Sequence, residues 1–173
     1  GKSDIQELNN TDTIAGCIIL EGGRIGKINN TNGATANCMS FSNGASVDNL
    51  NNSGTIKESI TNDSGSITVN NGGSGSIGGI TTSNGGTTTI INGGMDKPGG
   101  NIGAISNTGS NSNTHIDGWT LDNPDNPNNP IIIADGSDKD GIHLKEDSIF
   151  VNAELETGKI YNYHSYIQNE DKK

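Results

Sequence analysis

The feature that most constrains the fold is the regular spacing of isolated Ile residues between residues 51 and 94. Ile56, Ile67, Ile77 and Ile90 recur roughly every ten residues, each after a short run of small residues. Two successive spacings make a repeat of about 21 to 23 residues. The repeat gives the expected coil-to-coil pairs Ile56 with Ile77, Ile67 with Ile90, and Ile80 with Ile102. Apolar residues spaced in this way are buried only when successive repeats stack on one another. The pattern therefore predicts a solenoid.

An earlier form of the same pattern occupies residues 16 to 50. The segment at residues 16–28 can be laid over residues 37–50 at a shift of 21 to 22. The shift pairs five positions, the last two after one inserted residue: Cys17 with Cys38, Ile18 with Met39, Leu20 with Phe41, Ile25 with Val47, and Ile28 with Leu50. Five pairs at one shift are stronger evidence of a repeat than any single motif in the chain.

Composition favours strands over helices and an ordered rod over a compact globule. Hydrophobic residues make up 28% of the 173-residue chain, against roughly 45–50% in a globular domain by a count that includes Gly. The 26 glycines raise the alternative of a disordered, low-complexity chain. Against this alternative, the apolar residues are periodic and are mainly Ile and Val, which suit a pleated surface, and Gly and Asn break helices but permit sharp corners. The prediction is an all-β parallel solenoid of about 22 residues per coil.

The solenoid pattern divides the chain into four parts. Residues 1–13 are a polar N-terminal segment or an incomplete first coil, and residues 14–110 carry the repeats. Residues 111–168 are more apolar and aromatic, and we expect them to form the last coils and a denser cap that stabilises the rod, since a solenoid needs its open end covered. Residues 169–173 are expected to be a frayed tail.

Charge excludes some partners. The formal net charge is −10, and the ten Lys and Arg residues form no basic cluster, which argues against nucleic acid or an anionic membrane as partner. The chain has neither the roughly 20-residue apolar run of a membrane span nor the n-region and h-region of a signal peptide at its first residues. If the protein is secreted, we expect this chain to be a mature piece or an excised fragment of a precursor.

Short strings in the repeats carry a family resemblance. Residues 52–56 (NSGTI), 63–67 (DSGSI) and 100–105 (GNIGAI) resemble the degenerate N-S-G-x-I repeats of bacterial autotransporter passengers, the secreted halves of type V secretion proteins. The resemblance covers about residues 14–110, and more loosely extends to residue 168. It implies a right-handed parallel β-helix, exported through the periplasm to the cell surface by a C-terminal outer-membrane barrel that this chain lacks. The Gly-Asp-Ser-Gly motif of the protease members is absent, so no protease activity is carried over.

Two candidate sites follow from individual residues. Cys17 and Cys38 would lie on adjacent coils, either as a disulfide, which an oxidising compartment favours, or as stacked free thiols in the core. A catalytic or metal-binding pair is a more remote third reading. Asn9, in Glu7-Leu8-Asn9-Asn10-Thr11, is a candidate glycosylation acceptor that resembles the bacterial form of the N-x-[ST] signal.

No cofactor or metal is expected. The aspartate-rich loop at residues 135–141 approaches the calcium-loop pattern but lacks the first ligand and the final bidentate Glu, and is interpreted as a solvated turn. The three histidines, His115, His143 and His164, are too dispersed for a zinc site.

These observations predict a non-enzymatic passenger fragment, at the bacterial cell surface or secreted, that acts in adhesion or self-association. Its partner would be a host-cell or matrix receptor, or another copy of itself. The alternatives are a secreted polysaccharide-degrading enzyme and an inert structural stalk. The enzyme is disfavoured because Arg24 is the only arginine and the repeats hold few carboxylates, chiefly Glu58, Asp63 and Asp96, which fall on different phases of the coil. An ice-binding face of Thr81, Thr82 and Thr87–Thr89 would need a T-x-T in every coil, which the chain does not repeat.

Overall fold

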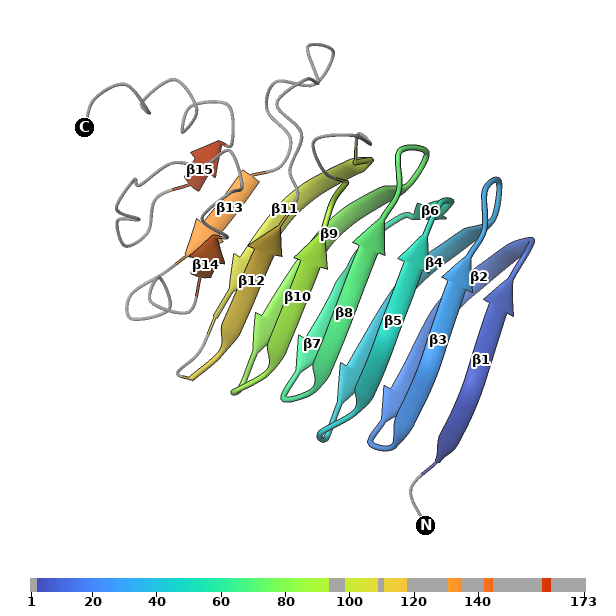
Figure 1. The fold of residues 1–173 in the computed structure, drawn as a ribbon, viewed down its shortest axis with the longest axis horizontal. Coiled ribbons are helices and arrows are strands. Elements are labelled where there is room, and N and C mark those ends of the chain that lie inside the picture. Colours follow the sequence, from blue (N-terminus) through green and yellow to red (C-terminus); the bar gives the residue numbers. More distant parts are fainter. Residues whose placement is uncertain are drawn as a thin grey trace.

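The computed structural model of the protein describes residues 3–93, 99–108, 111–117, 131–134, 142–144 and 160–162. These residues form strands, turns and bends without a helix, and so include no helical segment long and apolar enough to cross a membrane. The strands make two sheets that face each other (Figure 1). Sheet A contains, in spatial order, β1 (Asp4–Asn10), β3 (Arg24–Asn30), β5 (Ser46–Asn52), β8 (Ser66–Asn71), β10 (Thr87–Ile91), β12 (Asn113–Asp117) and β14 (Ile142–Leu144).

Sheet B lies opposite and is built from the alternate strands. It contains β2 (Thr13–Glu21), β4 (Thr35–Ser42), the interrupted strand β6 (Thr55–Ile56) and β7 (Ile60–Asp63), β9 (Ser76–Ser83), β11 (Asn101–Asn107), β13 (Ile131–Ala134) and β15 (Ile160–Asn162). Its neighbouring strands are parallel except β13 and β15, which pair antiparallel.

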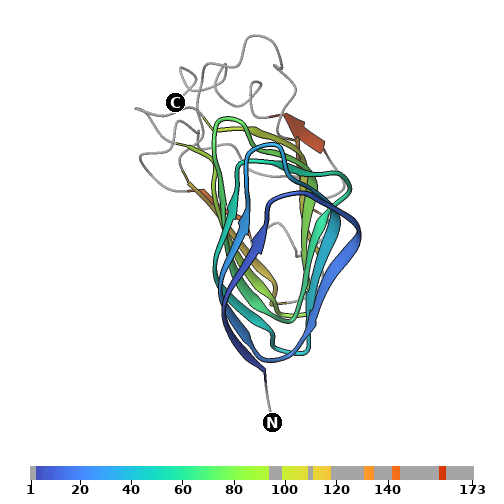
Figure 2. The same ribbon diagram turned by 90° about the vertical axis from the view of Figure 1, so that its right-hand side faces the viewer.

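The chain alternates between the sheets, so that each coil adds one strand to sheet A and one to sheet B. Seen from the N-terminal end, it rises through sheet A, crosses the top, descends through sheet B and recedes from the viewer with each coil (Figure 2). This clockwise, receding path makes the solenoid right-handed. The structure therefore confirms the all-β, right-handed parallel β-helix, with hydrogen-bonded residues on adjacent coils 19 to 22 positions apart along most of the rod.

The strand register confirms all five residue pairs expected for the first coils. Cys17, Ile18 and Leu20 of β2 pair with Cys38, Met39 and Phe41 of β4, and Ile25 and Ile28 pair with Val47 and Leu50. Among the later coils the pair Ile56–Ile77 is also confirmed.

Two later pairs were wrong. Ile67 pairs with Thr88, and Ile80 pairs with Ile105. The first error arises because a threonine occupies an inward position where the pattern suggested isoleucine. The second arises because the coil between Ile77 and its partner Ile102 is longer than the coils that precede it.

The inward side chains stack in columns along the axis. In sheet B the second inward column is Met39, Ile60, Ile80 and Ile105, and in sheet A the corresponding column is Ile28, Leu50, Val69, Ile90 and Ile116. Each of these side chains is at most 1% exposed. A core one or two side chains wide is thus continuous along the rod, which is how a chain of low apolar content buries what it has.

A ladder of buried asparagines runs beside the apolar columns, at the end of the sheet A strands. Its members, here called the inner ladder, are Asn10, Asn30, Asn52, Asn71 and Asn92. The Nδ2 of each of the first four members donates to the Oδ1 of the next member, at 2.8, 2.8, 2.9 and 3.0 Å. Each of these four also donates to a backbone carbonyl of the next coil, as Asn52 does to Ser76 O at 3.3 Å. Asn92, the last member, donates to Gly100 O at 3.0 Å. The ladder therefore satisfies buried polar groups and ties each coil to the next.

The corners explain the N-S-G-x-I strings. In residues 52–56, Asn52 belongs to the inner ladder and donates to Gly54 O at 3.1 Å, while Ile56 is in the core. Gly54 lies so close to the preceding coil that a Cβ would meet the Ala34 carbonyl oxygen at 2.4 Å, and only glycine fits there. At the opposite corner, Gly65 has the same constraint against Ala45 O at 2.6 Å.

Candidate functional surface

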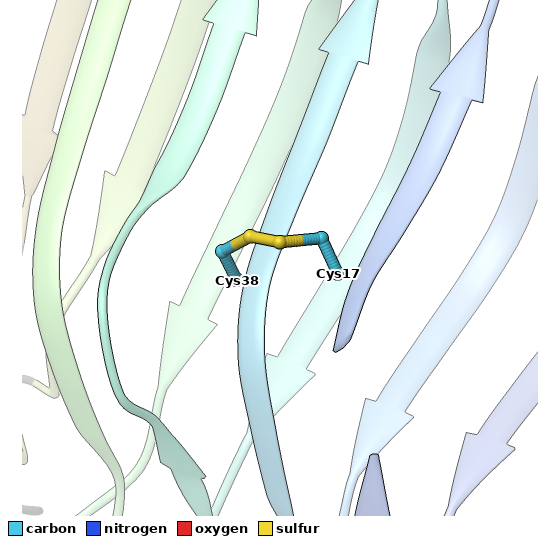
Figure 3. The surroundings of a disulfide bond; sticks show 2 residues. All are labelled: Cys17 and Cys38. Atoms are coloured by element: carbon cyan, nitrogen blue, oxygen red, sulfur yellow. A yellow bond between two sulfur atoms is a disulfide. The ribbon is translucent and has the colours of Figure 1, made fainter. Parts of the chain in front are cut away.

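The two cysteines meet on the outside of the first coils. Cys17 of β2 and Cys38 of β4 form a disulfide with their Cα atoms 4.5 Å apart and a sequence separation of 21 (Figure 3). Cys17 is exposed and Cys38 is half-buried. The disulfide therefore crosses the outer face of sheet B, and neither sulfur lies in the core column where stacked free thiols would have been placed.

The candidate glycosylation residue Asn9 lies in the outward-facing row of β1. Its Oδ1 accepts a hydrogen bond from Asn29 Nδ2 at 2.8 Å, and the same Nδ2 donates to Glu7 Oε1 at 3.0 Å. Asn9 is exposed while the next residue, Asn10, is buried in the inner ladder. The N-x-[ST] triplet therefore spans a strand end, with its acceptor residue on the surface.

Asn9 also begins a second ladder on the outer face of sheet A. Asn29 donates to Asn9, Asn51 donates to Asn29 at 3.0 Å, and Asn70 donates to Asn51 at 3.0 Å. This outer ladder donates toward the N-terminus, opposite in direction to the inner ladder. Adjacent asparagines in the sequence thus serve both faces of one sheet.

Charged side chains gather on the first coils. Arg24 of β3 forms ion pairs with Asp48 of β5 and, at 3.2 Å, with Asp4 of β1, and thereby bridges three strands. Its hydrogen bonds to and attraction by Asp48, with a smaller contribution from Asp4, raise the pKa of the Arg24 guanidinium. All three groups are substantially exposed, so the bridge adds little stability.

Part of the rod that follows carries no charge within the residues that the structure describes. Residues 64–93 and 99–108 contain no Asp, Glu, Lys, Arg or His. Their outward positions carry hydroxyl and amide groups on a background of glycine and alanine, together with the half-buried Ile91 of β10. We call the outward side chains of β8, β9, β10 and β11 the neutral surface; its hydrogen-bonding members are Ser66, Thr68, Asn70, Ser76, Thr81, Ser83, Thr87, Thr89, Asn101 and Ser106. On both sheets the surface is flat, polar and free of titratable groups.

Of the threonines considered for an ice-binding face, Thr82 and Thr88 point inward and are buried, while Thr81, Thr87 and Thr89 point outward. The buried pair joins a polar network that sequence reasoning missed. Thr88 Oγ1 lies 3.0 Å from Asn62 Nδ2 and 2.7 Å from Thr82 Oγ1. Thr114 Oγ1 lies 3.0 Å from Thr82 Oγ1 and 2.9 Å from Asn107 Oδ1. The inner corner of these coils is thus filled by a continuous chain of hydrogen bonds.

Within the described residues, no three His, Cys, Asp or Glu side chains are grouped so that they could hold a metal ion. Glu58 lies between β6 and β7, and Asp63 at the end of β7 accepts a hydrogen bond from Asn84 at 2.6 Å. His115 of β12 is a register partner of His143 of β14. The loop at residues 135–141, Asp96, His164 and the tail at residues 169–173 lie outside the described residues.

Comparison of the chain with protein-family models, with curated proteins and with solved structures finds no match.

Proposed function

We propose that the chain is a segment of a surface-exposed autotransporter passenger that acts without enzymatic chemistry, in adhesion or self-association. The observation that carries the proposal is the neutral surface. Its stacked hydroxyl and amide groups recur on successive strands of a rigid rod. A surface of this kind makes many weak hydrogen bonds to a receptor, to a matrix polymer or to another copy of itself, and the number of contacts compensates for the weakness of each.

The disulfide supports the part of the proposal that places the chain outside the cytoplasm. Cys17 and Cys38 are bonded on the outside of the rod, where the bond is open to small thiols. Exposed structural disulfides persist in the periplasm and outside the cell, and are rare where glutathione and thioredoxin keep thiols reduced. In the string at residues 52–56, Asn52, Gly54 and Ile56 occupy the ladder, corner and core positions, which agrees with the resemblance to passenger repeats. In the string at residues 63–67, Gly65 and Ile67 occupy the corner and core positions.

Display on bacteria tests the adhesive role. Bacteria that carry the chain on their surface should clump or bind host cells and matrix, and binding should persist at high salt because the neutral surface has no charges to screen. Thr89→Lys on sheet A and Thr81→Lys on sheet B each place a charge on this surface and should weaken binding if their sheet makes the contact. Gln6→Lys, at an exposed position of β1 among the charged coils, is the matched control and should bind normally.

Equal binding by the wild type and by both threonine variants would remove the neutral surface as the contact. Absence of any binding or clumping would favour a stalk. Release of reducing ends from acidic polysaccharide by the purified chain would favour an enzyme. The reading frame that encodes the chain gives a separate test of export, since the proposal expects a downstream outer-membrane barrel of roughly ten-residue alternating strands.

A further inference from the structure

Strand β2 carries one more residue than its neighbour β4, and the corner after it carries one fewer. Ile14 pairs with Ala36 and Cys17 pairs with Cys38, so that two residues of β2 lie opposite the single Asn37. At the corner, only Gly22 and Gly23 lie between the pair Glu21–Ser42 and the pair Arg24–Ser46, whereas β4 uses residues 43–45. The two differences cancel, and the coil as a whole keeps its length.

The sequence of β2 does not decide by itself which face points inward. Ile18 is half-buried and Leu20 is 8% exposed, while Ile19 between them is 63% exposed. Of the described large hydrophobic side chains, only Ile5 and Ile19 are exposed. A slip of one residue exchanges the two faces of a strand, and in β2 the exchange would put one large apolar side chain, Ile19, into the core.

A second register is open to β2 with no change in coil length. If the extra residue moved from the strand into the corner, β2 would match β4 at a constant shift of 22: Cys17 would lie opposite Met39, Ile19 opposite Phe41, and Arg24 would still pair with Ser46. The inward residues would then be Ile14, Cys17 and Ile19, with the same spacing as the inward residues Ala36, Met39 and Phe41 of β4. The corner would gain the three-residue length that β4 has.

The second register has a cost at the corner and another in the core. Glu21 would take the place of Asn43, whose φ is 55°, a conformation that Asn adopts more readily than Glu. Ile19 would leave solvent and the bulge would disappear, but the half-buried Ile18 and the buried Leu20 would move to the outer face. The neighbouring strand β6–β7 has the same extra residue but no such choice, since a slip there would replace buried Ile60 and Asn62 by the polar residues Ser59 and Thr61.

We propose that the Cys17–Cys38 disulfide is a redox-controlled lock that holds β2 in the bulged register. The bond requires Cys17 to face outward beside Cys38, which the second register forbids because it turns Cys17 toward Met39. Reduction by a dithiol transfers two electrons and two protons to the bridge, breaks the Sγ–Sγ bond to give two thiols, and leaves the reductant as a disulfide. The reduced chain then populates both registers, so that the face of sheet B near the N-terminus alternates between exposing Ile19 and exposing Ile18 and Leu20.

Alkylation of the reduced chain tests the proposal. In the bulged register Cys17 is exposed and Cys38 half-buried, so a fixed strand reacts with iodoacetamide faster at Cys17. In the second register Cys17 is inward and protected. The measurement is the ratio of the two alkylation rates, followed by mass spectrometry, with circular dichroism to show that the reduced chain keeps its strands.

Two variants give opposite expectations. Ile19→Thr penalises the second register and should raise the Cys17 to Cys38 ratio severalfold above the reduced wild type. Ile18→Thr penalises the bulged register and should lower it. Because Ile19 is exposed, its substitution leaves the oxidised fold intact and carries the test if Ile18→Thr fails to fold. An equal ratio in the reduced wild type and in Ile19→Thr, whether from a fixed strand or from general unfolding, would overturn the proposal.

Discussion

The first and the later coils of the rod share one backbone path but differ inside and outside. At the inner corner from sheet B to sheet A, the first coils bury Leu20, Phe41, Ile25 and Val47. The later coils place Asn62, Thr82, Asn107, Thr88 and Thr114 in the same columns. Outside, the first coils carry charges and a disulfide, whereas residues 64–93 and 99–108 carry no charge.

The polar inner corner of the later coils shows that a coil does not need an apolar residue at every inward position. The inner ladder, the corner glycines, two apolar columns of sheet B and one apolar column of sheet A continue through both halves. A fully buried Phe or Leu stabilises by about 1.5–3 kcal/mol, whereas a satisfied hydrogen bond contributes a net of only about 0.5–1.5 kcal/mol. We therefore expect the first coils to be the stable part of the rod.

Removal of the largest apolar side chain from the first coils should have the largest effect. Phe41 is fully buried, and Phe41→Ala should lower the free energy of unfolding by about 3–5 kcal/mol through lost burial and the cavity left behind. Urea denaturation of the oxidised chain measures the change. Ser40→Ala, at the adjacent outward position, should change it by less than about 0.5 kcal/mol. Similar losses for both variants would contradict the apolar corner as a source of stability.

A break in the inner ladder should come next, because the ladder spans both halves. Asn52→Ala removes donation to Asn71, Gly54 and Ser76 and acceptance from Asn30. The expected loss is roughly 2–3 kcal/mol, from bonds worth about 0.5–1.5 kcal/mol each and a buried carbonyl left without its donor. Asn51→Ala in the outer ladder, measured in the same denaturation series, should lose less than about 1 kcal/mol. Equal losses would mean that burial of the ladder is unimportant.

A smaller effect is expected in the polar corner of the later coils. Thr88→Val keeps the shape of the side chain but removes the hydroxyl that bonds Asn62 and Thr82. Asn62 and Thr82 keep other hydrogen-bond partners, so the expected loss is about 1–2 kcal/mol, from two bonds worth about 0.5–1.5 kcal/mol each. Thr89→Val at the outward neighbour is the control for the change in β-propensity. A gain in stability for Thr88→Val would show that the network is a cost to the fold and not a support.

The smallest effect is expected at the charged surface. Arg24→Gln removes the bridge between Asp4 and Asp48, but all three groups are exposed and screened by solvent. The midpoint of thermal unfolding should move slightly at low salt, and the difference from the wild type should vanish at high salt. A large shift that persists at high salt would contradict this assignment.

Sequence reasoning recovered the fold and much of the register, because spacing determines which residues stack. The pairs of β2 with β4 and of β3 with β5 follow from one shift of the sequence. It missed the polar interior because it followed apolar residues alone, and so paired Ile67 with Ile90 where Thr88 is the inward partner.

The inner ladder also has a signal in the sequence, but it lies in the spacing of Asn residues and not in the spacing of Ile residues. An Asn recurs two positions after an apolar residue of the inward face, in the strings LNN, INN, LNN, VNN and IIN that end at the five ladder members. The neutral surface was also visible in the sequence as a lack of charge. That its hydroxyls form two flat faces required the register, since alternate residues of each strand point to opposite sides.

The most direct test of the two-part rod is hydrogen exchange of the backbone amides in the oxidised chain, resolved by position. Amides protected by strand pairing exchange at rates that report local unfolding. We predict the slowest exchange in β3, β4 and β5, where the apolar corner, the disulfide and the inner ladder coincide, and faster exchange in β10 and β12. Slowest exchange in the later coils or in residues 111–168, as expected of a stabilising C-terminal cap, would contradict the account.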